Sequence, residues 1–345
     1  MAHELYMIDD AYSMAYTGDT PWHGLGQQII AEASVDEWIK QAKLDWTIKR
    51  APVMFNADGT VNDFDAQHVL YRSDTAKPLS VVHKSYKVVQ PHEVVRFFAD
   101  LIDLGNLKIE TAGSLFDGKK IWALASLNKN FNLGDGDIVK NYVLLASSCD
   151  RSIATTGRLT NVRVVCNNTL TWAYANNENM VKVSHRSKFD EDQQQDMKVQ
   201  LGLLGKAAQQ SRKQLIALTE TKVKPVEAVA FFLRVLNTST KKDEIDLENI
   251  APRAMKKIWD AYHGSPGANK TTAKGTLWGA VNAISFVTDH NTSAHGAESR
   301  LNSAWFGPGQ ALKVKAVDLA MSVADGYTDL MEGIGDTAGN VLKVA

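Results

Sequence analysis

The chain has 345 residues, of which 44% are hydrophobic and 22% charged, and its formal net charge is −1. These totals are typical of a globular protein and exclude a uniformly basic nucleic-acid-binding protein. No apolar run approaches the ~18 residues that span a bilayer, and the acidic start lacks the order of a signal peptide, so we expect a cytoplasmic protein.

The N-terminal part alternates strands with two helices. Ser34 and Glu37 have the spacing of a capping box, which predicts a helix over residues 35–44. The Asp-Gly pair at 58–59 is a hairpin signal. A second helix is expected over residues 92–104, because apolar residues recur there at helical spacing. The strands expected in this part cover residues 46–55, 68–72 and 81–89.

A β-meander is predicted next. Turn sequences at 116–119 and 133–137 separate apolar segments of strand length. The run at 142–148 is apolar enough for a central strand, which is buried on both faces. The strands of this meander are expected over residues 107–115, 121–127, 139–148 and 162–166.

The stretch at 161–175 reads NVRVVCNNTLTWAYA and changes period in the middle. Val162, Val164 and Cys166 occupy alternate positions, which predicts a strand. Small polar residues at 167–169 are typical helix caps, so we expect a helix to begin there. The free N–H groups at the start of such a helix favour a bound anion.

Helical patterns follow the sheet. A heptad seam from Met197 to Leu218 predicts one long helix, packed inside the chain by default or against a second copy. The Gly-rich tail from Gly333 is expected to fray. The fold class is therefore α+β, with an N-terminal, mainly antiparallel β-sheet domain with packed helices over residues 1–187 and a mainly helical domain over residues 188–345. The remaining helices are expected over residues 225–236, 252–262, 276–289 and 310–324.

The motifs of the common enzyme and cofactor sites are missing from the sequence. It lacks the phosphate loop, nucleophile elbow, zinc-protease and dinucleotide-binding patterns, so we expect no cofactor, and no motif argues for an enzyme. Cys149 and Cys166 are expected to be reduced packing residues. Asp289 and His290 come nearest to a metal-ligand pair, but a histidine near a helix C-terminus is favoured without a metal, so no metal site is expected.

One part of the chain is basic and contains the 161–175 stretch. Residues 151–224 have 12 Lys and Arg against 6 Asp and Glu. Such a local excess attracts polyanions, since Lys and Arg contact phosphates and aromatic rings stack on unpaired bases. The alternative is a solvated charged face, with Trp172 in the core. The candidate nucleic-acid-binding residues are Lys119, Lys120, Arg151, Arg158, Arg163, Asn167, Asn168, Trp172, Lys182 and Arg186.

Five stretches carry a resemblance to a known family. They are RVVCNNTL at 163–170, PWHGLG at 21–26, TAGSLFDG at 111–118, TLWGAVNAISFVTDH at 276–290 and RLNSAWFG at 300–307. Together they resemble a phage/plasmid-like protein family of unknown function, which implies a bacterial host cytoplasm and supplies no catalytic residues. The predicted sheet and helix are more distantly similar to RecT-type single-strand annealing proteins, and that similarity implies a basic groove and ring or filament assembly.

We therefore expect a mobile-element protein that binds single-stranded nucleic acid, as an annealing or recombination accessory protein, and that forms a homo-oligomer without contacting a membrane. The alternative is an interaction protein that acts on host machinery, in counter-defence or regulation, without DNA binding. The neutral total charge, the acidic N-terminal part and the heptad seam favour that alternative. A hydrolase built on scattered His and Asp is a third reading.

Overall fold

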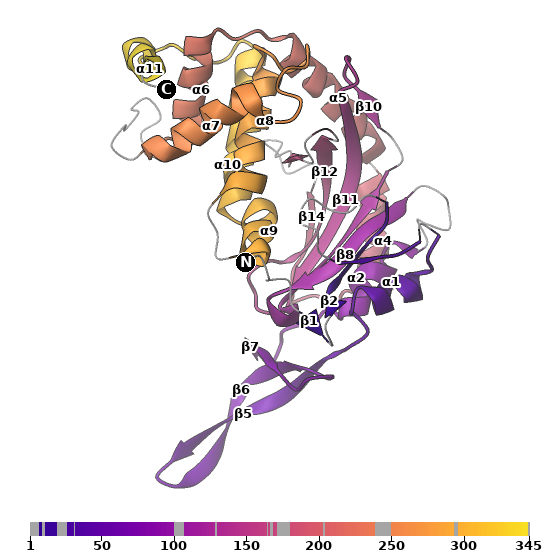
Figure 1. Ribbon diagram of the computed structural model, residues 1–345. Coiled ribbons are helices and arrows are strands. Elements are labelled where there is room, and N and C mark those ends of the chain that lie inside the picture. The colour runs from indigo at the N-terminus through magenta and orange to yellow at the C-terminus, as the bar shows by residue number, and fades with distance from the viewer. Residues whose placement is uncertain are drawn as a thin grey trace.

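The expected α+β class is confirmed by the computed structural model, in which a region of antiparallel sheet is followed by a helical region (Figure 1). In the described ranges, no helix combines the length and the apolar character that a membrane crossing requires. The structure describes residues 7–8, 11–18, 26–30, 32–99, 107–127, 130–163, 165, 168–170, 180–202, 204–238, 250–292 and 296–343.

The largest sheet has nine strands in the described ranges, and its main order is β13-β12-β11-β9-β8-β3-β4. Strand β10 pairs with β11, and β14 pairs with β12 beside β13. The β3–β4 pair is parallel and the other described pairs are antiparallel. The strands are β3 (Met14–Tyr16), β4 (Gln27–Gln28), β8 (Lys108–Leu115), β9 (Lys120–Ser126), β10 (Phe131–Asn132), β11 (Ile138–Ser148), β12 (Thr155–Arg163), β13 (Asn168–Leu170) and β14 (Met180–Val183).

Strand β11 is central because its residues are apolar on both faces. Val143 and Leu145 point to one hydrophobic core, while Leu144 and Ala146 point to another on the opposite face. Successive side chains of a strand alternate between the faces of a sheet, so a continuous apolar run requires cover on both sides. Helices provide that cover.

Three helices cover one face of the sheet. Helices α1 (Val35–Gln41), α2 (Pro91–Arg96) and α4 (Glu191–Gly202) supply Trp38, Val94 and Met197 to the same core as Val143 and Leu145. Figure 1 shows these helices together on one side of the strands. On the other face α9 (Ala297–Phe306) packs Leu301 against a core that includes Trp122 and Leu144.

A separate three-stranded sheet carries a long hairpin. It consists of β5 (Ile48–Ala57), β6 (Thr60–Arg72) and β7 (Pro78–His83) in the order β5-β6-β7. The inner end is anchored by Ile48, Leu70 and other buried residues. The outer end projects away from the body of the molecule (Figure 1). A two-residue hairpin, β1 (Met7–Ile8) with β2 (Ala11–Tyr12), completes the described strands.

The helical region surrounds α8, which is apolar around most of its circumference. Residues 277–285 of α8 are all buried, as expected for a helix at the centre of a core. This core also includes Phe131 and Val139 of the large sheet, so it continues from the helices to β10 and β11. The other elements are α5 (Leu204–Glu220), α6 (Pro225–Leu236), α7 (Pro252–Gly264), α8 (Leu277–Phe286), a π-helical turn (Val287–Asn291), α10 (Pro308–Ala324) and α11 (Gly335–Leu342).

Several local predictions have clear outcomes. The capping box of α1 is confirmed, because the Ser34 hydroxyl accepts the Glu37 N–H at 3.2 Å and Glu37 accepts the Ser34 N–H at 2.7 Å. The second helix is shorter than expected and ends at Arg96. The tail after Gly333 forms α11, so the expected fraying is wrong for residues 335–342.

The heptad seam is divided between two helices and two cores. Met197 of α4 packs under the sheet, whereas Leu215 and Leu218 of α5 belong to the helical core. The seam residues whose burial is described therefore pack inside the chain. The domain boundary at residue 187 stays a prediction.

The expected strand-to-helix corner is wrong for the residues described. Asn168–Leu170 form β13, which returns antiparallel along β12 and pairs Arg163 with Asn168 and Asn161 with Leu170. Asn168 and Thr169, expected as helix caps, thus begin a strand that pairs with β12. Residues 171–179 lie outside the described ranges.

Candidate functional site

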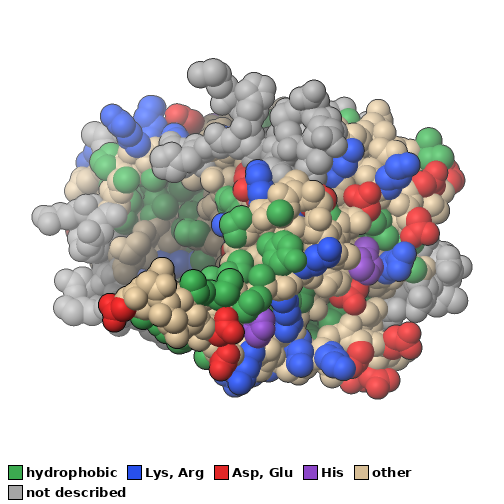
Figure 2. Space-filling model, turned by 90° about the horizontal axis from the view of Figure 1, so that it is seen from below, with side chains coloured by type: hydrophobic (Ala, Val, Ile, Leu, Met, Phe, Trp, Pro, Cys, Tyr) green, Lys and Arg blue, Asp and Glu red, His purple; other side chains and the backbone are tan. Residues whose placement is uncertain are grey.

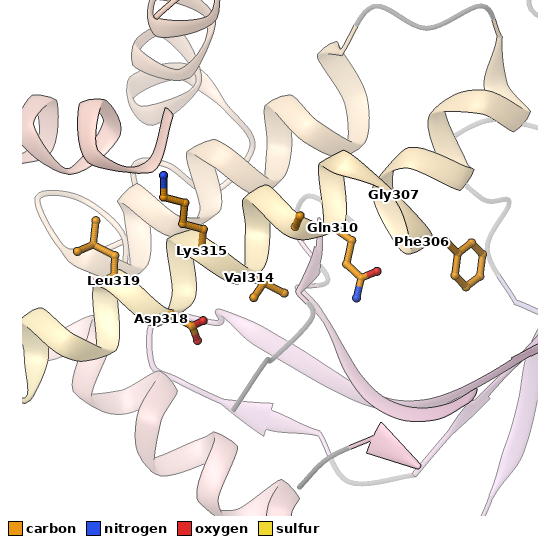
Figure 3. A pocket seen from close by; sticks show the side chains of 8 residues that line it. Phe306, Gly307, Gln310, Val314, Lys315, Asp318 and Leu319 are labelled. Carbon is orange, nitrogen blue, oxygen red and sulfur yellow. The ribbon is translucent and has the colours of Figure 1, made fainter. Parts of the chain in front are cut away.

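A groove runs between α10 and the edge of the large sheet. It consists of two adjoining cavities, of about 590 and 330 Å³, that share Phe306 and Gln310. The first follows α10, where Figure 3 shows Gln310, Val314 and Asp318 projecting from the same side of the helix. The second lies over the sheet. We call the two cavities together the groove.

Strand pairing explains which side chains line the sheet wall of the groove. Two cross-strand rows meet there, because β12 pairs with β11 on one side and with β14 on the other. One row is Leu144, Arg158 and Met180, and the next is Ala146, Thr156 and Lys182. Directly paired residues point to the same face of a sheet. All six line the cavity over the sheet.

Arg158 is a buried cation on the floor of the groove. Its side chain donates to the Trp305 carbonyl, and its guanidinium carbon lies 5.6 Å from the centre of the Phe306 ring. Only 6% of Arg158 is exposed, and burial lowers the pKa of its guanidinium to about 10. In the described part of the chain no carboxylate forms an ion pair with Arg158. A buried charge without a partner is costly, so an anion entering the groove would be stabilised there.

Lys120 approaches the same aromatic ring from β9. Its ammonium group lies 5.8 Å from the centre of the Phe306 ring and donates to Asn302 Oδ1 at 2.5 Å. Burial lowers the pKa of Lys120, and the charge of Asp150 acts in the opposite direction. Lys182 is exposed at the mouth of the groove. Lys120 and Arg158, from two different strands, thus lie beside one partly exposed phenylalanine, and Lys182 lines the same cavity as Phe306.

The α10 wall adds charge of both signs. Lys315 and Asp318 line the cavity along α10 with Val314 and Leu319. Burial raises the pKa of the Asp318 carboxyl. The groove therefore combines apolar walls with Arg158, Lys182 and Lys315 on its lining and a single carboxylate among the described lining residues.

Of the ten residues that the sequence suggests, three come together here: Lys120, Arg158 and Lys182. Arg151 and Arg186 are exposed, and Lys119 is half-buried; none of them lines the described cavities. Asn168 lies in β13, and nothing is described of its side chain. Asn167 and Trp172 lie outside the described residues.

Arg163 is a structural residue in this fold, although its sequence context suggests phosphate binding. It is completely buried, and its Nε and Nη2 donate to the two oxygens of Asp137, each at 2.7 Å. The same carboxylate accepts Thr272 Oγ1 at 2.7 Å and Trp278 Nε1 at 2.9 Å. Arg163 also donates to the Gly267 carbonyl at 3.0 Å. This cluster joins β12 and the turn before β11 to α8 and the segment before it, so Arg163 is withdrawn from any surface.

The acidic residue considered as a metal ligand is also used in packing. Asp289 accepts the Lys313 ammonium at 2.6 Å, and both residues are buried. Burial lowers the pKa of Lys313, and Asp289 opposes that effect. Within the described ranges, no three His, Cys, Asp or Glu side chains are grouped so as to hold a metal ion.

Two residues of the groove were missed by reasoning from the sequence. Phe306 lies in the RLNSAWFG stretch that contributes to the family resemblance, so a signal was present, although not as a binding residue. Lys315 is one of several polar residues along α10, and its sequence context has no feature that separates it from a solvated lysine.

A model of a protein family matches residues 78–305, and its description is "Domain of unknown function (DUF932)". The chain belongs to the DUF932 family. The DUF932 match contains β8 to β14 and ends at Trp305, so the sheet wall of the groove lies inside it and α10 lies beyond it. Residues 48–72 of the long hairpin also lie outside the DUF932 match.

No curated protein and no solved structure matches the chain. The expected membership of a family of unknown function is confirmed. A phage or plasmid origin and a relation to single-strand annealing proteins stay expectations.

Proposed function

We propose that the groove binds single-stranded nucleic acid, with Arg158 and Lys182 holding phosphate groups and Phe306 contacting a base. The observation that carries this proposal is the buried guanidinium of Arg158, which has no carboxylate partner in the described residues and lines an open groove. A phosphate group supplies the missing negative charge and accepts the remaining N–H donors of arginine.

The shape of the groove favours a strand over a small anion. From Gln310 to Leu319 its wall follows α10 for about 14 Å at 1.5 Å per residue. A partly exposed aromatic ring beside cations is the arrangement that binds unpaired bases, because stacking needs a free base face. Bases of a duplex are already stacked and paired, so a single strand suits the groove better.

Such binding fits a role as a single-strand annealing or recombination accessory protein of a mobile element. That role depends on the proposed binding and on a phage or plasmid origin. An oligonucleotide competition experiment tests the binding itself. Labelled oligo-dT is titrated with the purified chain at low salt. Three competitors are then added in separate experiments: unlabelled oligo-dT, duplex of the same length, and polyglutamate.

Displacement by single-stranded DNA at much lower concentration than by duplex or polyglutamate supports the proposal. Equal displacement by all three identifies a general polyanion site, and no binding at micromolar protein refutes the proposal. Phe306→Leu is expected to weaken oligonucleotide binding by roughly tenfold, because base–aromatic stacking contributes about 1–3 kcal/mol. The matched control is Trp259→Leu, a partly buried aromatic of α7 that does not line the groove.

A further inference from the structure

The projecting part of the long hairpin, residues 51–66 of β5 and β6, is called the arm below. The arm exposes four large apolar side chains: Met54 (58% exposed), Phe55 (50%), Val61 (64%) and Phe64 (45%). Large apolar groups clustered on a projecting element are typical of an interaction surface. Residues 51–66 contain Asp58, Asp63 and Asp65 and no Lys or Arg, so the arm is also acidic.

The register of the hairpin gives the arm exposed apolar side chains on both faces. Met54 lies opposite Asp63, and Val61 lies opposite Asn56, which puts Met54 and Val61 on one face. Phe55 lies opposite Asn62, which puts Phe55 on the other face, and Phe64 lies in the stretch where the register of the hairpin shifts. An element that is apolar on both faces is suited to enter a cleft, because a flat surface would cover only one face.

The arm cannot be covered by the groove of its own chain. Figure 1 shows the hairpin pointing away from α10 and the helical region. In the view from below (Figure 2), hydrophobic and acidic side chains lie side by side on this projecting surface. The apolar side chains of the arm thus face solvent or another molecule.

The groove has the complementary character. Its walls include Phe306, Val314 and Leu319, and its cations are Arg158, Lys182 and Lys315 against Asp318. Both surfaces are therefore apolar, with excess charge of opposite sign. Pairing of two arms with each other is disfavoured, because it would bring the aspartates together.

We propose that the arm of one copy of this chain inserts into the groove of a second copy. Arm and groove are different surfaces, so the contact is heterologous: each copy offers one arm and one groove, and repetition gives a ring or an open chain. The arm and a nucleic acid would compete for the groove. The arm contact itself needs only the apolar walls and the charge of the groove, whether or not nucleic acid binds there.

The test measures the mass of the full chain in solution at low salt, alone and in mixtures. The arm variant carries Phe55→Ser with Phe64→Ser, and the groove variant carries Lys182→Glu with Lys315→Glu. These four side chains are at least partly exposed, so both variants are expected to fold. The wild type is expected to self-associate. The self-association affinity of each variant alone is expected to be lower by roughly tenfold or more, because truncating interface anchors has effects of that size.

Mixing the two variants gives the decisive result. The groove variant keeps its arm and the arm variant keeps its groove, so a one-to-one complex forms and grows no further. A matched control is Val199→Ser, which removes an exposed apolar side chain of α4 and is expected to leave association unchanged.

A monomeric wild type at the highest soluble concentration overturns the proposal. Association that persists in the arm variant also overturns it, as does a mixture that forms no complex. Loss of association in the arm variant alone, with the groove variant unaffected, identifies a different partner surface for the arm and refutes the pairing.

Oligonucleotide binding by the arm variant separates this proposal from the proposed function. If the mixed variants form their complex but the arm variant, whose groove is free of arms, binds no oligonucleotide, only the proposed function fails. If oligonucleotide binds and the mixed variants stay apart, only the arm proposal fails.

Discussion

Replacing Asp137 by Asn should destabilise the protein strongly, because this carboxylate accepts four hydrogen bonds in the core. Two come from Arg163, one from Thr272 and one from Trp278, at 2.7 to 2.9 Å. The amide cannot accept all four bonds and carries no charge, so the Arg163 guanidinium is left buried without its counter-ion. Removing one partner of a buried ion pair costs about 3–5 kcal/mol, and we expect a loss in that range.

Urea denaturation followed by tryptophan fluorescence and by circular dichroism measures the free energy of unfolding. Asp135→Asn is the matched control, since Asp135 is exposed in the adjoining turn and its side chain accepts bonds only from Thr271 in the described contacts. Its cost should stay within about 1 kcal/mol, as is usual for exposed sites. A loss below about 1 kcal/mol for Asp137→Asn, or an equal loss in the control, would refute the structural role of the cluster.

The pH dependence of that loss has a definite sign. Burial tends to raise the pKa of Asp137, but the Arg163 guanidinium and the bonds from Thr272 and Trp278 outweigh it and lower the pKa below its ordinary value. The ionised carboxylate therefore stabilises the fold above its unfolded pKa of about 3.9, and this stability is lost as the pH falls through the lowered folded value. The difference in the free energy of unfolding between the wild type and Asp137→Asn should therefore be constant near neutral pH and should become smaller only in acid.

Three further predictions concern single substitutions. Gly118→Ala should lower the free energy of unfolding, measured in urea, by more than about 2 kcal/mol, because Gly118 has φ +98° and a Cβ would lie 2.4 Å from the Trp46 ring. The control is Gly59→Ala, which is also at positive φ but in open space and should lower it less. Ser34→Ala should cost about 1 kcal/mol in the same measurement, because it removes the cap of α1. The wild type should bind oligo-dT more tightly as the pH falls through the raised pKa of Asp318, since protonation removes the negative charge from the groove, and Asp318→Asn should abolish that part of the pH dependence.

Local patterns predicted the main elements of the fold for physical reasons that act within a few residues. The capping box at Ser34 and the apolar run around Val143 each specify hydrogen bonds or burial directly. The end of the sheet was predicted less well. Whether Asn168 begins a helix or a strand depends on its pairing with β12. The propensities of the residues near Asn168 carry no information about that tertiary contact.

The candidate site shows the same limit. Arg158 and Arg163 lie on the same strand. The alternation of side chains along that strand does not show which of the two arginines packs against a carboxylate. The structure puts Asp137 against Arg163, 26 residues away in sequence, and puts the Phe306 ring beside Arg158. Burial without a carboxylate partner is what separates the candidate binding residue from the structural one, and it follows only from tertiary packing.

The most direct test of the central claim is the salt dependence of oligo-dT binding by Arg158→Gln beside the wild type. Each phosphate contact contributes about −0.7 to the slope of log affinity against log salt for single strands. Loss of the Arg158 contact should lower affinity by roughly tenfold or more at low salt and reduce the slope by about 0.7. Lys182→Gln, an exposed change, should reduce the slope by a similar amount, while Arg253→Gln on α7 should leave it unchanged. If Arg158→Gln and Lys182→Gln both keep the affinity and the salt slope of the wild type, nucleic-acid binding in the groove is contradicted.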